Sequence, residues 1–218
     1  MSRDFEWPEF AFLLTGLQWT AALALVAFLG GTVAGLLIAL LRTAPAAPLR
    51  WIARGYIGVF QGTPLLMQLF LVYFGLAVLA GVRMEPWPAV STAFTLYAAA
   101  FLGEIWRGAI EAVPREQWEA GIALALPRRI ILLRIVLPQA LRIAIPPTVG
   151  FLVSLVKGTS VAAIIGFVEL TRAGQLMVNV TFQPMVVYPV VALLYFAVCW
   201  PLSLLALRLE KRLERGRA

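Results

Sequence analysis

Charge is scarce in this chain of 218 residues. Only 13% of the residues are charged, against 61% that are hydrophobic, and the mean hydropathy is +0.89. A soluble domain of this size carries about twice that charged fraction. The shortage of charge therefore excludes an ordinary soluble domain, and we expect an all-α integral membrane protein.

Histidine is absent, cysteine occurs once, at Cys199, and lysine occurs only at Lys157 and Lys211. A single cysteine cannot form an intrachain disulfide, and the lack of histidine removes the commonest metal ligand and the commonest general base. Neither lysine belongs to a glycine-rich loop of the kind that cradles the phosphates of ATP. We therefore expect no catalytic residue, no bound cofactor and no metal site in this chain.

Several apolar windows are long enough for transmembrane helices, which need about 20 residues each. We predict a five-span transmembrane helical bundle with spans at residues 10–41, 54–83, 85–104, 130–156 and 186–207. The fourth window contains Arg134, Arg142 and three prolines, so we expect a broken helix there. The tripeptide at 62–64, Gly-Thr-Pro, is expected to break the second span near its start. Gly31 and Gly35 in the first span permit close helix packing, within the chain or between copies.

Basic residues gather after the first span, around residues 107–134 and at the C-terminal end. The positive-inside bias places these segments in the cytoplasm and the N-terminus outside. We expect three parts, with no secretory signal: an extracytoplasmic segment at 1–14, a transmembrane domain at 15–210 with a cytoplasmic loop at about 108–130, and a basic tail at 211–218. The tail can contact anionic membrane lipid. Topology thus explains the net charge of +7, and no basic groove with interleaved aromatics indicates nucleic-acid binding.

The cytoplasmic loop has the pattern of two short helices. Residues 115–126 are rich in alanine and leucine and predict a helix. Pro127 disfavours helical backbone at the preceding residue and suits the first turn of a following helix, so we expect a sharp turn there. Small residues beside Glu119 permit close approach of a partner protein. An amphipathic connector lying on the membrane surface explains the same pattern equally well.

A longer pattern favours the partner-binding loop over the membrane-surface connector, because it resembles that of a known family. Glu119-Ala120-Gly121, three residues, Ala125, nine residues and then the segment 135–138, Ile-Val-Leu-Pro, resembles the cytoplasmic EAA loop of ABC importer permeases. Further segments resemble the polar amino acid branch of that family, the histidine, glutamine and glutamate type: residues 55–75, 103–121, 137–147, 154–160 and 164–175. The resemblance covers about residues 15–210.

The resemblance implies a permease subunit of a type I ABC importer, a multi-pass protein of the bacterial inner membrane. Its expected partners are a second permease subunit, identical or paralogous, two ATPase subunits that bind ATP and Mg, and a solute-binding protein. In this family the EAA loop docks into a groove of the ATPase. By position, the docking residues would be Glu119, Ala120 and Gly121, with Arg107 and Arg115 on the approach. Arg115, Ala125 and Pro127 would belong to the same ATPase-coupling loop.

Three positions depart from the family pattern. Ala125 stands where the family has glycine, and Gly121 stands where it has the second alanine. If the family glycine serves a left-handed backbone conformation, alanine costs about 1 kcal/mol there, unless Pro127 has taken over the turn. Gly158 stands where many relatives have aspartate, which argues against a cationic amino acid as the transported solute.

Polar side chains at membrane depth are the candidates for the substrate pathway, because an unpaired polar group there is costly. They are Gln61, Thr63 and Gln68 in the second span, and Lys157, Thr159 and Ser160 at the end of the fourth. Each can instead satisfy a hydrogen bond between helices, and Lys157 can extend its amine to the membrane surface.

Two other functions fit a protein with several spans. One is a secondary transporter or channel subunit that works without ATP, and the other is a membrane scaffold whose loop binds a partner. The sequence shows no inverted repeat and no intramembrane carboxylate suited to ion coupling, which argues against the first. The importer permease is therefore the leading hypothesis.

Overall fold

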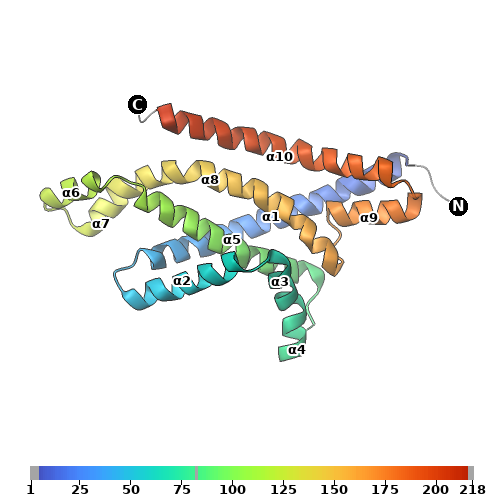
Figure 1. Cartoon of the computed structure of the whole chain (residues 1–218), viewed down its shortest axis with the longest axis horizontal. Helices are drawn as coiled ribbons and strands as arrows, with labels where there is room; N and C mark the ends of the chain where they lie inside the picture. The colour runs from blue at the N-terminus through green and yellow to red at the C-terminus, as the bar shows by residue number, and fades with distance from the viewer. Residues whose placement is uncertain (1–4, 82, 216–218) are drawn as a thin grey trace.

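The computed structural model describes residues 5–81 and 83–215, and within these ranges every regular element is helical. Four long helices form the body of the molecule: α1 (Trp7–Arg42), α5 (Pro86–Glu111), α8 (Leu137–Gly158) and α10 (Pro184–Arg215). Figure 1 shows α1, α5 and α8 alongside one another, with α10 along the outside against α8. The predicted all-helical class is confirmed.

Four helical segments are long and apolar enough to cross a membrane: Trp7–Arg42, Pro86–Glu111, Arg128–Ile165 and Pro184–Leu213. A fifth span exists if α2 (Ala47–Gly62) and the bent segment Leu65–Leu79 are counted together. That segment comprises α3 (Leu65–Phe70), a π-helical turn (Leu71–Gly75) and the beginning of α4 (Leu76–Ala80). Among the described residues, the structure therefore supports four or five spans, and the fifth depends on a bent pair.

The pair α1 and α5 packs through glycine and alanine. A Cβ atom added at Gly31 would lie 2.5 Å from Cβ of Ala98, and one added at Gly35 would lie 3.1 Å from the carbonyl oxygen of Ala99. These approaches are closer than side chains allow, so the two backbones are almost in contact. The small-residue spacing of the first span thus serves packing within the chain.

The second apolar segment is broken at Gly62-Thr63-Pro64, as the sequence predicts. Helix α2 ends at Gly62, α3 begins at Leu65, and the axis turns by 106° between them. Pro64 forces Thr63 into extended backbone, with φ −122° and ψ 146°. Helix α2 begins at Ala47, seven residues before Arg54, so the helix extends beyond the charge-free window that was predicted as the span.

The fourth span is continuous, which corrects the expectation of a broken helix. It runs through α7 (Arg128–Ile130), a π-helical stretch (Ile131–Val136), α8 and a 3₁₀ turn (Thr159–Ile165). The π-helical stretch ends just before Leu137, which places Pro138 in the first turn of α8, where a missing N–H is tolerated. Pro146 and Pro147 lie inside α8, because packing in a helical bundle can hold a helix that lacks individual backbone bonds.

Helix α9 (Leu170–Thr181) was not expected from the sequence. The carboxylate of Glu169 caps its first turn, accepting hydrogen bonds from the backbone N–H groups of Thr171 at 2.9 Å and Arg172 at 2.8 Å. The hydroxyl of Tyr195 in α10 donates to the same carboxylate at 2.8 Å. Glu169 is fully buried outside the candidate spans, and this burial raises its pKa. The cap therefore fixes α9 to α10.

Candidate functional site

Helix α6 (Arg115–Ala123) lies at one end of the bundle, beyond the body of α5 and α8 (Figure 1). The C-terminal part of α10 reaches toward the same end, whereas α1 begins at the other. Three residues connect α5 to α6, and α7 leads directly into the fourth long span. The predicted helix at 115–126 is thus present but ends three residues early.

The turn after α6 has left-handed backbone at Ala125, with φ 54°. The N–H of Leu126 donates to the carbonyl of Gly121 at 3.1 Å, and the N–H of Ala125 donates to that of Ile122 at 2.9 Å. These two bonds define a Schellman motif, in which the left-handed position usually holds glycine. Ala125 therefore adopts the backbone conformation that favours glycine. Pro127 precedes α7, and the left-handed turn is still present before it.

Gly121 faces the bundle, and its packing explains the second departure from the family pattern. A Cβ atom at this position would lie 2.8 Å from Cγ1 of Ile131, which is fully buried. The larger Ile131 side chain thus uses the space that an alanine methyl would need. Trp118 and Leu126 pack against the same cluster, whose buried members are Ile110, Val113, Ile131, Val136 and Ala140.

The other predicted docking residues lie on the surface of this loop. Glu119 and Ala120 are exposed on α6, Arg115 is exposed at its first position, and Ala125 and Pro127 are exposed in the turn. The structure therefore places the six predicted coupling-loop positions on α6 and in the turn that follows it, and of the six only Gly121 is buried.

Arg107 is bound to the bundle and is not free. Its guanidinium donates to Glu104 at 2.6 and 2.9 Å and also to Glu111, one turn later in α5. Arg42 at the end of α1 lies 3.9 Å from the carboxylate of Glu104. A bidentate arginine–carboxylate pair is among the stronger polar contacts in proteins. The charges at the ends of α1 and α5 thus join these two helices.

Gln68 spans the break between α2 and α3. Its side-chain amide donates to the carbonyls of Phe60 at 2.8 Å and Thr63 at 3.0 Å, and also to the Thr63 hydroxyl at 3.0 Å. The Thr63 hydroxyl in turn donates to the carbonyl of Val59 at 2.7 Å. Gln68 and Thr63 therefore satisfy carbonyls that the missing helix turn leaves free. Gln61 is exposed.

The second predicted polar group lies at the end of α8. The buried hydroxyl of Thr159 donates to the carbonyl of Val156 at 2.7 Å, and Ser160 donates to that of Lys157 at 2.9 Å. Lys157 is exposed. A Cβ atom at Gly158 would lie 3.6 Å from Cδ2 of Leu65, so the end of α8 meets the start of α3. The two polar groups are therefore neighbours in the fold.

No group of three or more metal-ligand side chains occurs within residues 5–81 and 83–215. The arrangement offers helix-bound hydroxyls and amides, the exposed side chain of Lys157 and a protruding loop. Such groups can bind and position a polar solute or a partner protein.

Known proteins with the same sequence pattern and fold are transport subunits. The L-cystine transport system permease protein TcyB of Bacillus subtilis is 37% identical over 210 residues, 96% of this chain and 88% of that protein. The probable glutamine ABC transporter permease protein GlnM of the same species is 34% identical over 216 residues, 99% of this chain and all of that protein.

A solved structure agrees with these relatives. A chain from a crystal structure of an amino acid ABC transporter with histidines matches with a TM-score of 0.88 and 29% identity, covering 96% of this chain and all of that one. Residues 31–217 match the family described as the inner membrane component of binding-protein-dependent transport systems. The chain therefore belongs to this family and is a non-catalytic, membrane-spanning permease subunit of an ABC transporter.

Proposed function

We propose that this chain forms the translocation pathway of an ATP-driven importer for polar amino acids in the bacterial inner membrane, and couples to separate ATPase subunits through α6. The observation that carries the proposal is the exposed pair Glu119 and Ala120 on a helix that protrudes from the bundle. A small residue beside a carboxylate permits a partner's backbone to approach closely while offering it one strong acceptor.

The attachment of α6 supports mechanical coupling. Trp118 and Leu126 pack on the buried cluster at the ends of α5 and α8, and the turn after α6 is closed by two backbone hydrogen bonds. Helix α6 is therefore held at both ends by helices that belong to the membrane body. When the partner ATPases bind ATP with Mg and close, a docked α6 would move α5 and α8 with it and switch the pathway from inward to outward access.

The remaining partners follow from the same proposal. A second permease subunit, identical or paralogous, completes the pathway, and the exposed apolar face of α3 and the following π-helical turn suits such a contact, with Met67, Leu71 and Phe74 all at least half exposed. A solute-binding protein delivers the amino acid at the end of the bundle opposite α6. The basic residues on the side of α6 then face the cytoplasm.

Substrate contacts are proposed at the meeting point of α3 and α8. Donors and acceptors that helix packing does not bury are supplied by Gln61, Lys157 and Ser160. The surrounding backbone carbonyls accept hydrogen bonds from Thr63, Gln68 and Thr159. Gly158 leaves this point without a carboxylate, so we propose a polar amino acid without net positive charge. Relatives named for cystine and glutamine support that class, whereas a relative named for arginine, 31% identical over 216 residues, does not.

Reconstitution with the ATPase and solute-binding protein tests the coupling proposal. We expect Glu119→Lys to reduce binding-protein-stimulated ATP hydrolysis and amino acid uptake by about tenfold or more, since a like charge meets the partner's donors. The matched control is Glu116→Lys, which changes an exposed glutamate in the first turn of the same helix and should have a small effect.

Two outcomes would contradict the proposal. Full uptake by Glu119→Lys, with the ATPase still bound, would exclude α6 as the coupling element. Uptake by the wild-type complex without ATP would instead support the secondary transporter that the sequence left as the alternative.

A further inference from the structure

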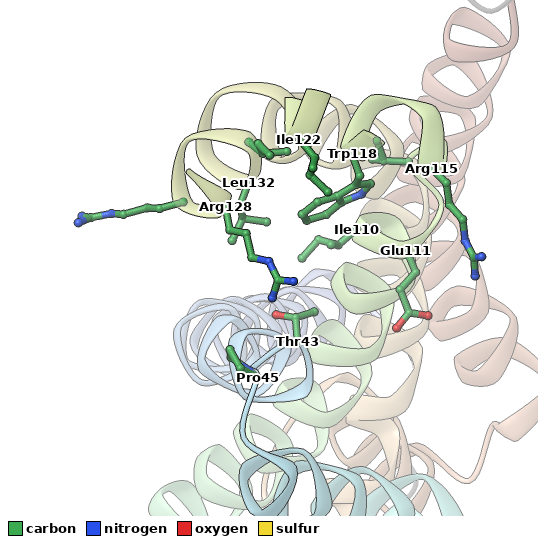
Figure 2. A pocket seen from close by; sticks show the side chains of 12 residues that line it. Thr43, Pro45, Ile110, Glu111, Arg115, Trp118, Ile122, Arg128 and Leu132 are labelled. Atoms are coloured by element: carbon green, nitrogen blue, oxygen red, sulfur yellow. The ribbon is translucent and has the colours of Figure 1, made fainter. Parts of the chain in front are cut away.

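A cavity of about 820 Å³ lies against α6, and neither Glu119 nor Ala120 lines it. It is enclosed by α6, α7, the end of α5 and the loop after α1, which contributes Thr43 and Pro45 (Figure 2). Neither the coupling proposal nor the pathway proposal uses this space. It is large enough for a substantial part of an organic ligand.

Positive charge dominates the lining of this cavity. Arg115, Arg128 and Arg129 line it, and none of the three forms an ion pair with any residue that the structure describes. The one acidic residue in the lining, Glu111, is already bound by Arg107. Figure 2 shows Arg128 extending from α7 toward Thr43, across the middle of the space. Arg128 therefore places an unpaired positive charge in the space, whereas the Arg115 side chain points away from it (Figure 2). The one carboxylate of the lining is already bound.

The opposite wall is apolar. Ile110 and Trp118 form its inner part, and Ile122 and Leu132 continue it toward the opening. Ile122 is 60% exposed, which is an unusual position for isoleucine on a helix that already has a packed inner face. A free inorganic anion would leave this wall in contact with water. A ligand that combines an anionic group with an apolar body matches both walls.

The location of the cavity favours a lipid. Thr43 follows Arg42, the last residue of α1, and Glu111 is the last residue of α5, so the cavity begins where two apolar helices end. The predicted first span ends at residue 41, so we place the cavity at the level of the phospholipid headgroups, where anionic headgroups accumulate beside basic segments. Guanidinium groups match the geometry of phosphate oxygens and bind them through paired hydrogen bonds.

We propose that this cavity binds the phosphate group of an anionic phospholipid, with Arg128 as the principal ligand and the acyl region against Trp118, Ile122 and Leu132. A lipid seated there lies between α6 and the loop after α1, and it holds α6 to the bundle from behind. The inference goes beyond the proposed coupling and does not require it, because binding is measured on the permease chain alone.

Native mass spectrometry of the purified chain, titrated with dioleoyl phosphatidylglycerol, tests the proposal. Wild type should retain one lipid, and Arg128→Gln should bind it about tenfold more weakly or worse, as expected for loss of a charged hydrogen bond. Arg128→Lys should fall between them because it keeps the charge and loses the paired geometry. The matched control is Arg134→Gln, which removes an exposed arginine outside the cavity and should bind like wild type.

Competing probes identify the source of the phosphate. Dioleoyl phosphatidylcholine, whose headgroup has no net charge, should not displace the bound lipid. Glycerol 3-phosphate at the same concentration should also fail, since it lacks the apolar part; equal competition would overturn the lipid assignment in favour of a free phosphate compound. Equal binding by wild type and Arg128→Gln, or an equal loss in Arg134→Gln, would overturn the site itself. Unchanged thermal unfolding of Arg128→Gln without lipid verifies that the exposed substitution leaves the fold intact.

Discussion

The chain turns sharply at Pro64 and at Pro127. At these two turns, different donors satisfy the last carbonyls of the preceding helix. Pro64 precedes α3 with φ −62° and ψ 138°, and Pro127 precedes α7 with φ −61° and ψ 141°, so their backbones are nearly identical. Each follows a helix whose last carbonyls lose their partners. At the first turn the side chain of Gln68 binds these carbonyls, whereas at the second the backbone N–H groups of Ala125 and Leu126 do so.

The surroundings account for the difference. The first turn interrupts an apolar segment, where water cannot replace a missing bond, so a side chain from the next helix reaches back. The second lies on an exposed loop, where a left-handed residue folds the chain back on its own helix and the outer face remains in water. The first turn thus depends on the side chains of Gln68 and Thr63, and the second on a single backbone conformation.

The largest effect should come from Gln68→Leu. This substitution keeps the volume but removes the donor to Phe60 and Thr63, and we expect it to lower the free energy of unfolding by about 2 kcal/mol. The unpaired oxygen of Gln68 disappears at the same time, which offsets part of the loss. Denaturant unfolding in detergent measures the change.

Gln61→Leu is the control for this substitution, because Gln61 is an exposed glutamine seven residues earlier. It should leave the free energy of unfolding almost unchanged. Equal stability of the two variants would mean that Gln68 does not support the break.

A smaller loss, about 1 kcal/mol, is expected for Thr63→Val, which removes the hydroxyl that donates to Val59 and accepts from Gln68. Thr15→Val is the matched control, since the Thr15 hydroxyl makes the same type of bond, to Ala11, inside the unbroken helix α1. Combining Thr63→Val with Gln68→Leu should give less than the sum of the single losses in the same unfolding experiment. Strict additivity would show that the two side chains act independently.

At the second turn, Gly121→Ala should cost about 1 kcal/mol because its methyl group meets Ile131 at about 2.8 Å. Ile131→Ala removes the γ and δ carbons that the methyl group meets, so Gly121→Ala should cost little in that background. Hydrogen exchange at the amides of α6 reports the local stability. If Gly121→Ala speeds exchange as much in the Ile131→Ala background as in wild type, the packing explanation for Gly121 is wrong.

The smallest effect is expected for Ala125→Gly, and it is the only one of these substitutions expected to increase stability. Glycine removes the strain of φ 54° and should stabilise the turn by about 0.5 kcal/mol after its larger chain entropy is counted. Exchange at the Leu126 amide should slow accordingly. Ala123→Gly, a substitution inside the helix two residues earlier, should instead speed exchange by a similar amount. A loss of stability in Ala125→Gly would contradict the assigned turn.

Much of this architecture could be predicted from local chemistry. Long apolar windows identified the main spans, and Pro64 and Pro127 marked both turns because proline acts on its immediate neighbours. Gly31 and Gly35 indicated close packing, although the sequence could not name Ala98 and Ala99 as their partners.

The features that the sequence did not predict depend on contacts between residues far apart in the chain. The fourth span is continuous despite Pro146 and Pro147 because the surrounding bundle holds it, and helix α9 is fixed by Tyr195 from α10. The left-handed Ala125 was an open question that only the backbone could answer. The orientation in the membrane, the segment limits and the roles of the docking and pathway residues stay predictions.

The close contact between α1 and α5 also has a consequence for how the protein is made. Gly31 leaves the ribosome more than sixty residues before Ala98, its partner. At 5 to 20 residues per second, Ala98 is therefore synthesised roughly 3 to 13 seconds after Gly31, and until then the packing surface of the first helix is not covered by α5. Glycine has no polar side chain, so lipid can cover the packing surface of α1. This helix therefore needs no partner helix until α5 is made.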